Sequence, residues 1–275
     1  MYPASFEYHR ATSVSHALDL LATYGDDAKL LAGGHSLLPV MKLRFAAPAH
    51  LIDLGRVTGL DGIAESGGVV TVGAMTRHAE IASSALLRAK APLLAEVAGH
   101  IGDQMIRNMG TIGGSLAHAD PAADLPAAML ALGASVQVQG KGGTRTISAD
   151  QFFVDTFQTS LAAGEILTAI QVPVATRACA YVKHPDPASG YAIVGVAVQL
   201  GASGGRVAMT GLAQRPMRLT AVEGALASGA AAADRAADGL ALIEDARGSV
   251  AYKANLARVF TRQAIEAALA NSALE

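Results

Sequence analysis

Two glycine-rich segments of this chain carry residue types that bind an anion through the main chain. The first comprises Leu30, Leu31, Ala32, Gly33, Gly34, His35 and Ser36, and the second contains Thr111, Ile112, Gly113, Gly114 and Ser115. Paired glycines adopt positive φ readily and let the backbone approach a ligand closely. Successive N–H groups in such a turn can hold an anion. The two segments therefore predict two loops that close on one large, phosphate-bearing cofactor.

Neither segment matches a common nucleotide-binding motif. The glycine spacing differs from the G-x-G-x-x-G of a Rossmann site, and the Gly-Lys-Ser/Thr of a P-loop does not occur. These absences disfavour a conventional NAD fold and a P-loop NTPase. In the second segment, we expect Thr111, Ser115 and the backbone N–H groups of residues 112–115 to donate to phosphate oxygens.

The acidic segment after the second loop has two interpretations. One is a helix N-terminus, with Asp120 as the N-cap, Pro121 in the first helical position and Asp124 in the first turn. In the other, the carboxylate of Asp124 accepts hydrogen bonds from ribityl hydroxyls of a bound cofactor. Both interpretations stay open at this point.

Catalytic and metal-binding patterns are missing from the sequence. His35 and His118 each lie beside a glycine loop, but no further ligands stand at the spacing of a zinc site. We therefore expect hydrogen-bonded structural roles for both. A nucleophile elbow, a His-Glu-x-x-His motif and paired carboxylates for hydrolysis do not occur either. The chain is expected to hold a reactive group, with no catalytic residue and no metal ligand of its own.

Composition narrows the class of protein further. The 275 residues are 51% hydrophobic and 16% charged, which predicts a well-buried core. The net charge is −2 and the basic residues are scattered, so nucleic acid and anionic membranes are not expected partners.

The N-terminal residues and the cysteine content indicate the cellular compartment of the protein. The single cysteine, Cys179, cannot form an internal disulfide, and it is expected to be a small buried residue in a strand. The first eight residues lack a signal-peptide pattern, and no apolar run approaches the ~20 residues of a membrane span. These features predict a cytoplasmic protein.

Hydrophobic periodicity divides the chain into three units. Residues 1–55 predict a helix at 13–24 ended by Gly25, strands at 28–32 and 50–54, and an amphipathic stretch at 37–44. Residues 56–175 predict strands at 68–73, 134–139 and 165–172, and helices at 76–82, 86–100 and 122–132. Residues 177–275 predict a hairpin of strands at 191–200 and 206–212, followed by alanine-rich helices that include 230–237.

With both loops in view, the chain resembles the FAD-binding medium subunit of molybdenum hydroxylases. This family contains carbon monoxide dehydrogenase medium subunits and the flavin portion of xanthine dehydrogenase. The matching segments, in family order, are residues 32–39, 41–44, 107–115, 119–126 and 189–197, with Tyr252 and Lys253 before Leu256. The chain departs from the family at Gly102, Asp103, Gln104 and Met105, where relatives often have Gly-Asp-Pro-Gln.

The resemblance implies an α+β fold and a set of cofactor contacts. The fold is a two-subdomain FAD-binding domain of the vanillyl-alcohol-oxidase (PCMH) type, followed by a C-terminal α/β domain. Both loops would grip the FAD pyrophosphate, through residues 30–36 and 111–115. Matched position by position, the further cofactor contacts are Ile101, Asp124, Leu167, Lys183 and Tyr191. Lys183 would donate to the flavin, although an ordinary exposed lysine at a strand end is the simpler reading.

The resemblance also implies a function. In such complexes a large molybdenum-cofactor subunit oxidises the substrate, and a small subunit relays electrons through two [2Fe–2S] clusters to FAD. The present chain would be the flavoprotein of a dimer of heterotrimers, passing electrons to an external acceptor. Substrate specificity would belong to the large subunit, so carbon monoxide, aldehydes, purines and other heterocycles all stay open. A stand-alone FAD oxidase of related fold is the alternative, and an assembly protein without FAD is a third.

Overall fold

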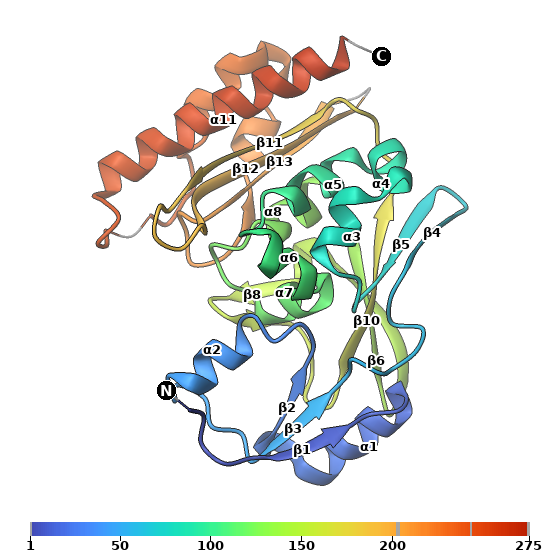
Figure 1. Cartoon of the computed structure of the whole chain (residues 1–275). Helices are drawn as coiled ribbons and strands as arrows, with labels where there is room; N and C mark the ends of the chain where they lie inside the picture. Colours follow the sequence, from blue (N-terminus) through green and yellow to red (C-terminus); the bar gives the residue numbers. More distant parts are fainter. Residues whose placement is uncertain (1, 202–203, 243, 274–275) are drawn as a thin grey trace.

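A computed structural model describes residues 2–201, 204–242 and 244–273 of the chain. Three main sheets follow one another along the molecule, with the N-terminal unit at one end and the C-terminal helix at the other (Figure 1). The predicted mixture of helix and sheet is confirmed. Across the described residues, no helix has the length and apolar character needed to cross a membrane.

The N-terminal unit is a small parallel sheet. Its elements are β1 (Glu7–Arg10), α1 (Val14–Tyr24), a 3₁₀ turn (Gly25–Asp27), β2 (Ala28–Leu31), α2 (Leu37–Lys42) and β3 (His50–Asp53). The strand order is β1-β3-β2, and both pairings are parallel. The Ser13 hydroxyl caps α1 by accepting from the His16 N–H, and Gly25, at φ +53°, ends the helix as predicted.

The central unit is built on a five-stranded antiparallel sheet. Its order is β4-β5-β10-β6-β7. The strands are β4 (Ile63–Ser66), β5 (Val69–Gly73), β6 (Ser135–Gly140), β7 (Gly143–Ser148) and β10 (Ile166–Pro173), with a small pair formed by β8 (Phe153–Asp155) and β9 (Gln158–Thr159). The helices are α3 (His78–Ser83), α4 (Ala85–Lys90), α5 (Pro92–Gly99), α6 (Gln104–Met109), α7 (Ile112–His118), α8 (Leu125–Ala131) and α9 (Ala149–Phe152). The core of this unit lies between the sheet and the helices.

The C-terminal unit is a four-stranded antiparallel sheet covered by a long helix. Its strands are β11 (Cys179–Pro185), β12 (Ala192–Gly201), β13 (Gly204–Thr210) and β14 (Met217–Arg218), in that order. Its helices are α10 (Thr220–Glu223), a 3₁₀ segment (Leu226–Arg235) and α11 (Val250–Ser272), and α11 lies over the sheet (Figure 1). The predicted pairing of the strands either side of residue 202 is confirmed, although residues 202 and 203 themselves lie outside the described part.

Three predicted helices differ from the structure. The single helix expected at 86–100 is two helices, because Pro92 has no N–H to continue the hydrogen-bond ladder and Ala91 has non-helical dihedral angles, with φ −151° and ψ 61°. The helix expected at 122–132 begins later, at Leu125. The segment 230–237 lies largely in a 3₁₀ segment that is kinked at Gly229, where φ is +62°.

Candidate functional site

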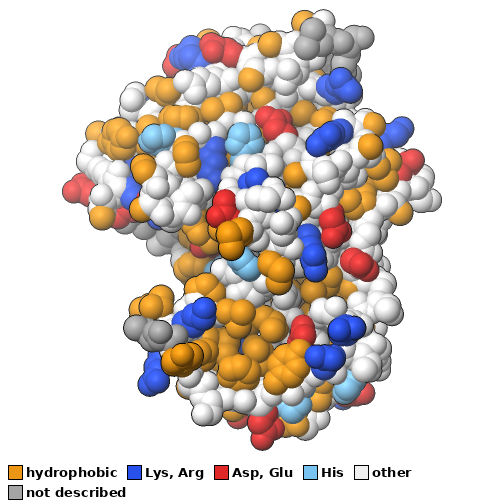
Figure 2. Space-filling view, viewed as in Figure 1, with side chains coloured by type: hydrophobic (Ala, Val, Ile, Leu, Met, Phe, Trp, Pro, Cys, Tyr) orange, Lys and Arg blue, Asp and Glu red, His pale blue; other side chains and the backbone are white. Residues whose placement is uncertain are grey.

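A cavity of about 650 Å³ lies where the N-terminal unit, the central unit and a loop of the C-terminal unit meet. Figure 2 shows the molecule hollowed on this face, with hydrophobic side chains gathered below the hollow. Most of the residues expected to contact the cofactor line it: Leu30, Ala32, Gly33, Gly34, His35, Ser36, Ile101, Thr111, Gly113, Gly114, Ser115, Asp124, Leu167 and Tyr191. Leu31, Ile112 and Lys183 are not part of this lining. The structure therefore brings together segments that are far apart in sequence.

The first glycine loop offers unpaired backbone donors. The loop leaves β2 and turns at Gly34, where φ is +74°. The N–H groups of residues 33–36 donate to no other described residue, and the ring Nδ1 of His35 lies 2.9 Å from the carbonyl of Gly33. His35 thus has the hydrogen-bonded position within the loop that was expected for it. A row of free N–H groups at the edge of a cavity is an arrangement that binds anions.

The second glycine segment has a different conformation from the one predicted. Residues 112–118 form α7, and the Thr111 hydroxyl caps this helix by accepting from the Gly114 N–H at 3.2 Å. The Ile112 N–H donates to Thr76, the Gly113 N–H to Ala74 and the Ser115 N–H to Thr111. The expectation that these four N–H groups donate to phosphate is therefore wrong, because each already has an acceptor in the protein. The hydroxyls of Thr111 and Ser115 remain at the cavity.

The glycines of both segments permit close packing of protein on protein. A Cβ on Gly33 would lie 2.3 Å from the carbonyl oxygen of Met109 and 2.7 Å from the Cα of Gly110. A Cβ on Gly113 would lie 2.6 Å from that of Ala74. The first loop is thus in direct contact with the approach to the second, and this contact requires glycine at position 33.

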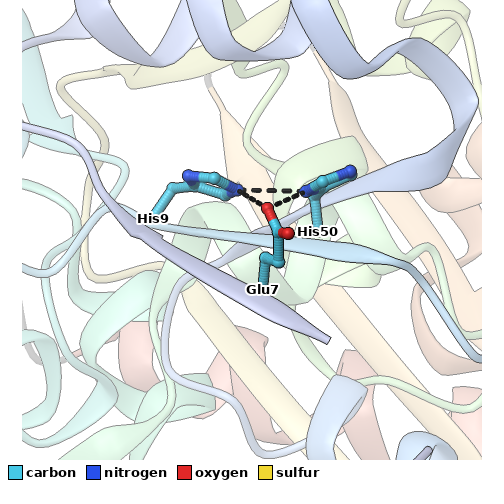
Figure 3. Close-up of side chains that lie close together, drawn as sticks. All are labelled: Glu7, His9 and His50. Atoms are coloured by element: carbon cyan, nitrogen blue, oxygen red, sulfur yellow. Dashed lines mark hydrogen bonds and ion pairs between the residues drawn. The ribbon is translucent and has the colours of Figure 1, made fainter. Parts of the chain in front are cut away.

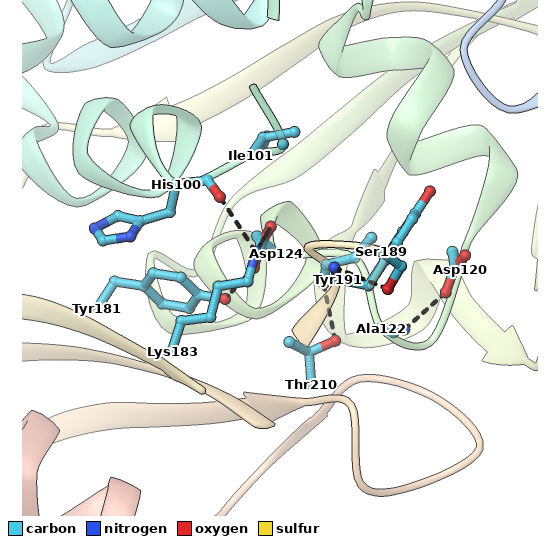
Figure 4. A network of polar contacts seen from close by, with 12 residues as sticks. His100, Ile101, Asp120, Ala122, Asp124, Tyr181, Lys183, Ser189, Tyr191 and Thr210 are labelled. Carbon is cyan, nitrogen blue, oxygen red and sulfur yellow. Dashed lines mark hydrogen bonds and ion pairs between the residues drawn. The ribbon is translucent and has the colours of Figure 1, made fainter. Parts of the chain in front are cut away.

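A buried polar network borders the cavity at Asp124 (Figure 4). The Lys183 ammonium lies 2.9 Å from Asp124 Oδ2 and 3.2 Å from the carbonyl oxygen of His100, while the Tyr181 hydroxyl donates to Asp124 Oδ1. Lys183 and Tyr181 are two residues apart on β11, so both side chains point to the same face of the sheet. The side chains of Lys183 and Asp124 are only 5% and 6% exposed, so the reading of Lys183 as an exposed lysine is wrong.

Electrostatics of this network reflect its burial. Desolvation raises the pKa of Asp124, and the nearby Lys183 ammonium offsets part of that effect. Burial raises the pKa of Tyr181 well above its ordinary value, and the Asp124 carboxylate adds to the shift. Tyr181 therefore stays a hydrogen-bond donor, and Lys183 neutralises the carboxylate that faces the cavity.

The acidic segment does not begin the helix as one of its interpretations required. Asp120 is wrong as an N-cap, because α8 begins at Leu125 and Asp124 occupies the position before it. The Asp120 carboxylate instead accepts from the Ala122 N–H at 2.8 Å. The Thr210 hydroxyl, from β13, donates to the carbonyl oxygens of Pro121 and Ala123. This turn is thus held in place by the C-terminal sheet.

Several residues at the cavity were not singled out as cofactor contacts from the sequence. They include Met75, His78, Ile106, Gly110, His118, Asp120, Phe157, Ser189 and Gly190. Gly190 and Tyr191 bring the C-terminal unit to the site, and the Tyr191 hydroxyl interacts with Ser36 of the first loop. Apart from Gly110, these residues lie outside the two glycine-rich segments, so the glycine motifs did not indicate them.

The buried His78 at the cavity is expected to make the stability of the protein depend on pH. It is buried beside Gly110, and its Nδ1 has no hydrogen-bond partner among the residues described. Burial, with His35 and Arg107 nearby, lowers the pKa of His78 to about 4. Between the unfolded pKa near 6.5 and about 4, the unfolded chain binds the extra proton, so stability falls as the pH falls. The full effect of this one group is about 3 kcal/mol.

We expect the free energy of unfolding to fall between pH 6.5 and 4, and less steeply in a His78→Asn variant. Chemical denaturation at several pH values measures both slopes. His100 and His118, whose pKa values are also lowered by burial, leave the variant a residual slope. Identical slopes in the two proteins would show that His78 is not held in its neutral form.

Comparison with known proteins identifies the class to which this fold and site belong. Residues 4–175 match the FAD binding domain in molybdopterin dehydrogenase, and residues 179–268 match the CO dehydrogenase flavoprotein C-terminal domain. The chain belongs to this family of FAD-binding medium chains of carbon monoxide dehydrogenase and related molybdenum hydroxylases, with FAD as the cofactor. As a member, it is part of an oxidoreductase.

Individual relatives match over nearly the whole chain. The carbon monoxide dehydrogenase medium chain of Hydrogenophaga pseudoflava is 42% identical, covering 99% of this chain and 100% of the relative. Subunit alpha of the 6-hydroxypseudooxynicotine dehydrogenase complex of Paenarthrobacter nicotinovorans is 38% identical, covering 98% and 96%.

Solved structures of proteins from the same family have the same fold as this chain. A carbon monoxide dehydrogenase structure from H. pseudoflava, lacking the Mo-pyranopterin moiety, superposes with a TM-score of 0.94 at 44% identity, over 98% of this chain and 99% of that one. Quinoline 2-oxidoreductase from Pseudomonas putida 86 gives a TM-score of 0.92 at 32% identity, over 98% and 99%. The predicted fold class and family are confirmed.

Proposed function

We propose that this chain holds FAD in the cavity and is the electron-transfer subunit of a molybdenum-containing hydroxylase. It would take electrons from [2Fe–2S] clusters on a partner chain and pass them to an external acceptor. The observation that carries this proposal is the row of N–H groups at residues 33–36, which have no acceptor among the residues described and lie on the cavity. The medium chains to which this chain is related support the assignment to a complex.

The cavity has the chemistry that FAD requires at each of its parts. The free N–H groups of residues 33–36 and the hydroxyls of Thr111 and Ser115 would hold the pyrophosphate. Residues 30, 31 and 112 would act by shaping these loops. The lining also contains apolar side chains, including Ile101, Ile166 and Leu167, which suit a ring system. The residues present thus fit the cofactor.

Asp124 and Lys183 would act together at the cavity. Each Asp124 oxygen already accepts one hydrogen bond, and a carboxylate oxygen can accept two, so Asp124 can still accept from cofactor hydroxyls. Lys183 lies behind Asp124 and fixes its charge and orientation, so its role is positioning. Tyr191, which is partly exposed at the rim, would cover the bound ring system and exclude water.

When bound, FAD supplies the redox chemistry, and the protein supplies its position and surroundings. The donors on the first loop would anchor the phosphates, and the buried carboxylate would hold the adjoining hydroxyls. The apolar lining would keep bulk water from the ring system. These tasks are all binding and orientation, which agrees with a chain that was expected to have no catalytic residue of its own.

We propose three structural domains, at residues 1–55, 56–175 and 177–275. Each of the three main sheets is built from strands of one segment only, which supports this division. The two family matches meet between residues 175 and 179, next to the second boundary. The cavity would then lie between domains, as cofactor sites often do.

We propose that the partners are a large molybdenum-cofactor subunit and a small iron–sulfur subunit, in a dimer of heterotrimers located in the cytoplasm. The single cysteine of the chain supports this, because cluster ligation by four thiolates must then come from another chain. The large subunit would select the substrate.

Purification of the intact complex tests this proposal. We expect the chain to co-purify with both partners and with one FAD per chain, released on denaturation. An isolated chain that oxidises a substrate by itself would favour the stand-alone oxidase instead. A complex that is purified gently and contains no FAD would contradict the proposal.

A further inference from the structure

Two histidines and a glutamate meet on one face of the N-terminal sheet, away from the cavity (Figure 3). Glu7 and His9 are two residues apart on β1, so their side chains lie on the same face. His50 opens β3, the strand that pairs with β1 in parallel, and its Cα is the register partner of that of Glu7. Sheet pairing thus brings together groups separated by some forty residues of sequence.

The three side chains are spaced like the ligands of one metal ion. His9 Nε2 lies 3.1 Å from His50 Nδ1, His50 Nδ1 lies 3.4 Å from Glu7 Oε2, and His9 Nε2 lies 3.8 Å from the same oxygen. With bonds of about 2.0–2.1 Å, ligand atoms of a tetrahedral zinc site are separated by roughly 3.3 Å. The three observed separations lie around this value, so one ion fits between all three atoms.

The imidazoles are held in place before any ion binds. The ring of Tyr24, the last residue of α1, stacks on His50 with centroids 3.8 Å apart and on His9 with centroids 4.8 Å apart. The side chains of His9 and His50 are 20% and 18% exposed, whereas that of Glu7 is 72% exposed. The stacked rings would bind the ion, and the exposed carboxylate of Glu7 would complete the set of protein ligands.

We propose that Glu7, His9 and His50 bind a divalent first-row transition metal ion, with zinc as the reference ion. Two imidazoles and one carboxylate are a donor set that suits zinc, nickel, copper and iron(II). The exposed side would leave a fourth position for water. The ion would cross-link β1 to β3 and so stabilise the sheet that carries the first glycine loop. This site is separate from the FAD cavity, whose lining includes none of the three residues.

Equilibrium dialysis of the full-length chain without an affinity tag, against Zn²⁺, tests the site. We expect one zinc per chain, and an affinity loss of at least roughly 100-fold in His9→Gln, His50→Gln and Glu7→Gln, because loss of an outer-shell partner alone costs up to that much. His16→Gln is the matched control, since His16 is a partly exposed histidine of α1 whose Nδ1 accepts from the Thr12 N–H. Zinc affinity equal in the wild type and the three variants would overturn the proposal.

X-ray absorption at the zinc edge provides a readout that does not depend on folded variants. We expect two imidazole ligands and light-atom oxygen ligands in the zinc-loaded wild-type chain. A shell without imidazole scattering would overturn the proposal. Thermal melting gives a further check, because zinc should raise the melting temperature of the wild type and of His16→Gln, but not that of His50→Gln.

Discussion

Replacing Gly33 with alanine is expected to weaken the binding of FAD to this chain. The added Cβ would lie 2.3 Å from the Met109 carbonyl oxygen and 2.7 Å from the Gly110 Cα, both of which are backbone atoms that cannot rotate away. The first loop must therefore separate from the approach to α7. Overpacking of this kind costs about 1–3 kcal/mol. If the cost falls on the bound geometry, FAD affinity drops by roughly 10- to 100-fold.

The measurement is the ratio of FAD to protein in purified Gly33→Ala, which should be lower than in the wild type. Gly142→Ala is the matched control, because a Cβ there meets nothing within 4 Å and its φ is not in the left-handed region. The control should retain FAD like the wild type. Full FAD occupancy in Gly33→Ala would contradict the close contact between the two segments as a requirement for binding.

Removing the charge of Lys183 is expected to destabilise the protein by about 3 kcal/mol, since truncating one partner of a buried ion pair leaves the other charge uncompensated. Lys183 and Asp124 are 5% and 6% exposed and 2.9 Å apart. In Lys183→Met, the Asp124 carboxylate loses its neutralising ammonium. For a chain of this size, the loss corresponds to a fall in melting temperature of roughly 5–10 °C.

An exposed ion pair serves as the control, because it separates the effect of burial on stability from the effect of losing one charge. Lys141 lies 3.3 Å from Asp19, but these side chains are 61% and 66% exposed, so Lys141→Met should change stability by well under about 1 kcal/mol. The double variant Asp124→Asn/Lys183→Met should recover part of the stability lost in Lys183→Met, because it leaves no uncompensated charge. Equal melting temperatures for Lys183→Met and Lys141→Met would contradict the claim that Lys183 forms a buried ion pair on which stability depends.

Local sequence signals predicted the elements around the first loop well. The helix over residues 13–24, its end at Gly25 and the apolar strand before Gly33 are encoded by neighbouring residues, and the structure confirms them. The family resemblance, based on motifs over most of the chain, gave the fold class and cofactor, which the comparisons confirm.

The features that sequence reasoning missed depend on contacts between distant residues. The second glycine pair looked like a turn, but Gly113 is selected by the backbone of Ala74, and its N–H group is used there. Lys183 looked exposed because its partner, Asp124, is far away in sequence. Glu7, His9 and His50 carry no ligand spacing along the chain, because only the register of β1 on β3 makes them neighbours.

The most direct test of the electron-transfer role is anaerobic absorbance spectroscopy of the whole complex and of the isolated FAD-loaded chain. Carbon monoxide, an aldehyde, a purine and an aromatic heterocycle would each be added in turn. We predict that a compound that reduces the iron–sulfur clusters of the complex also bleaches the flavin bands, and that the same compound leaves the flavin of the isolated chain oxidised. Flavin bands that stay oxidised in the complex while the clusters are reduced would contradict the account.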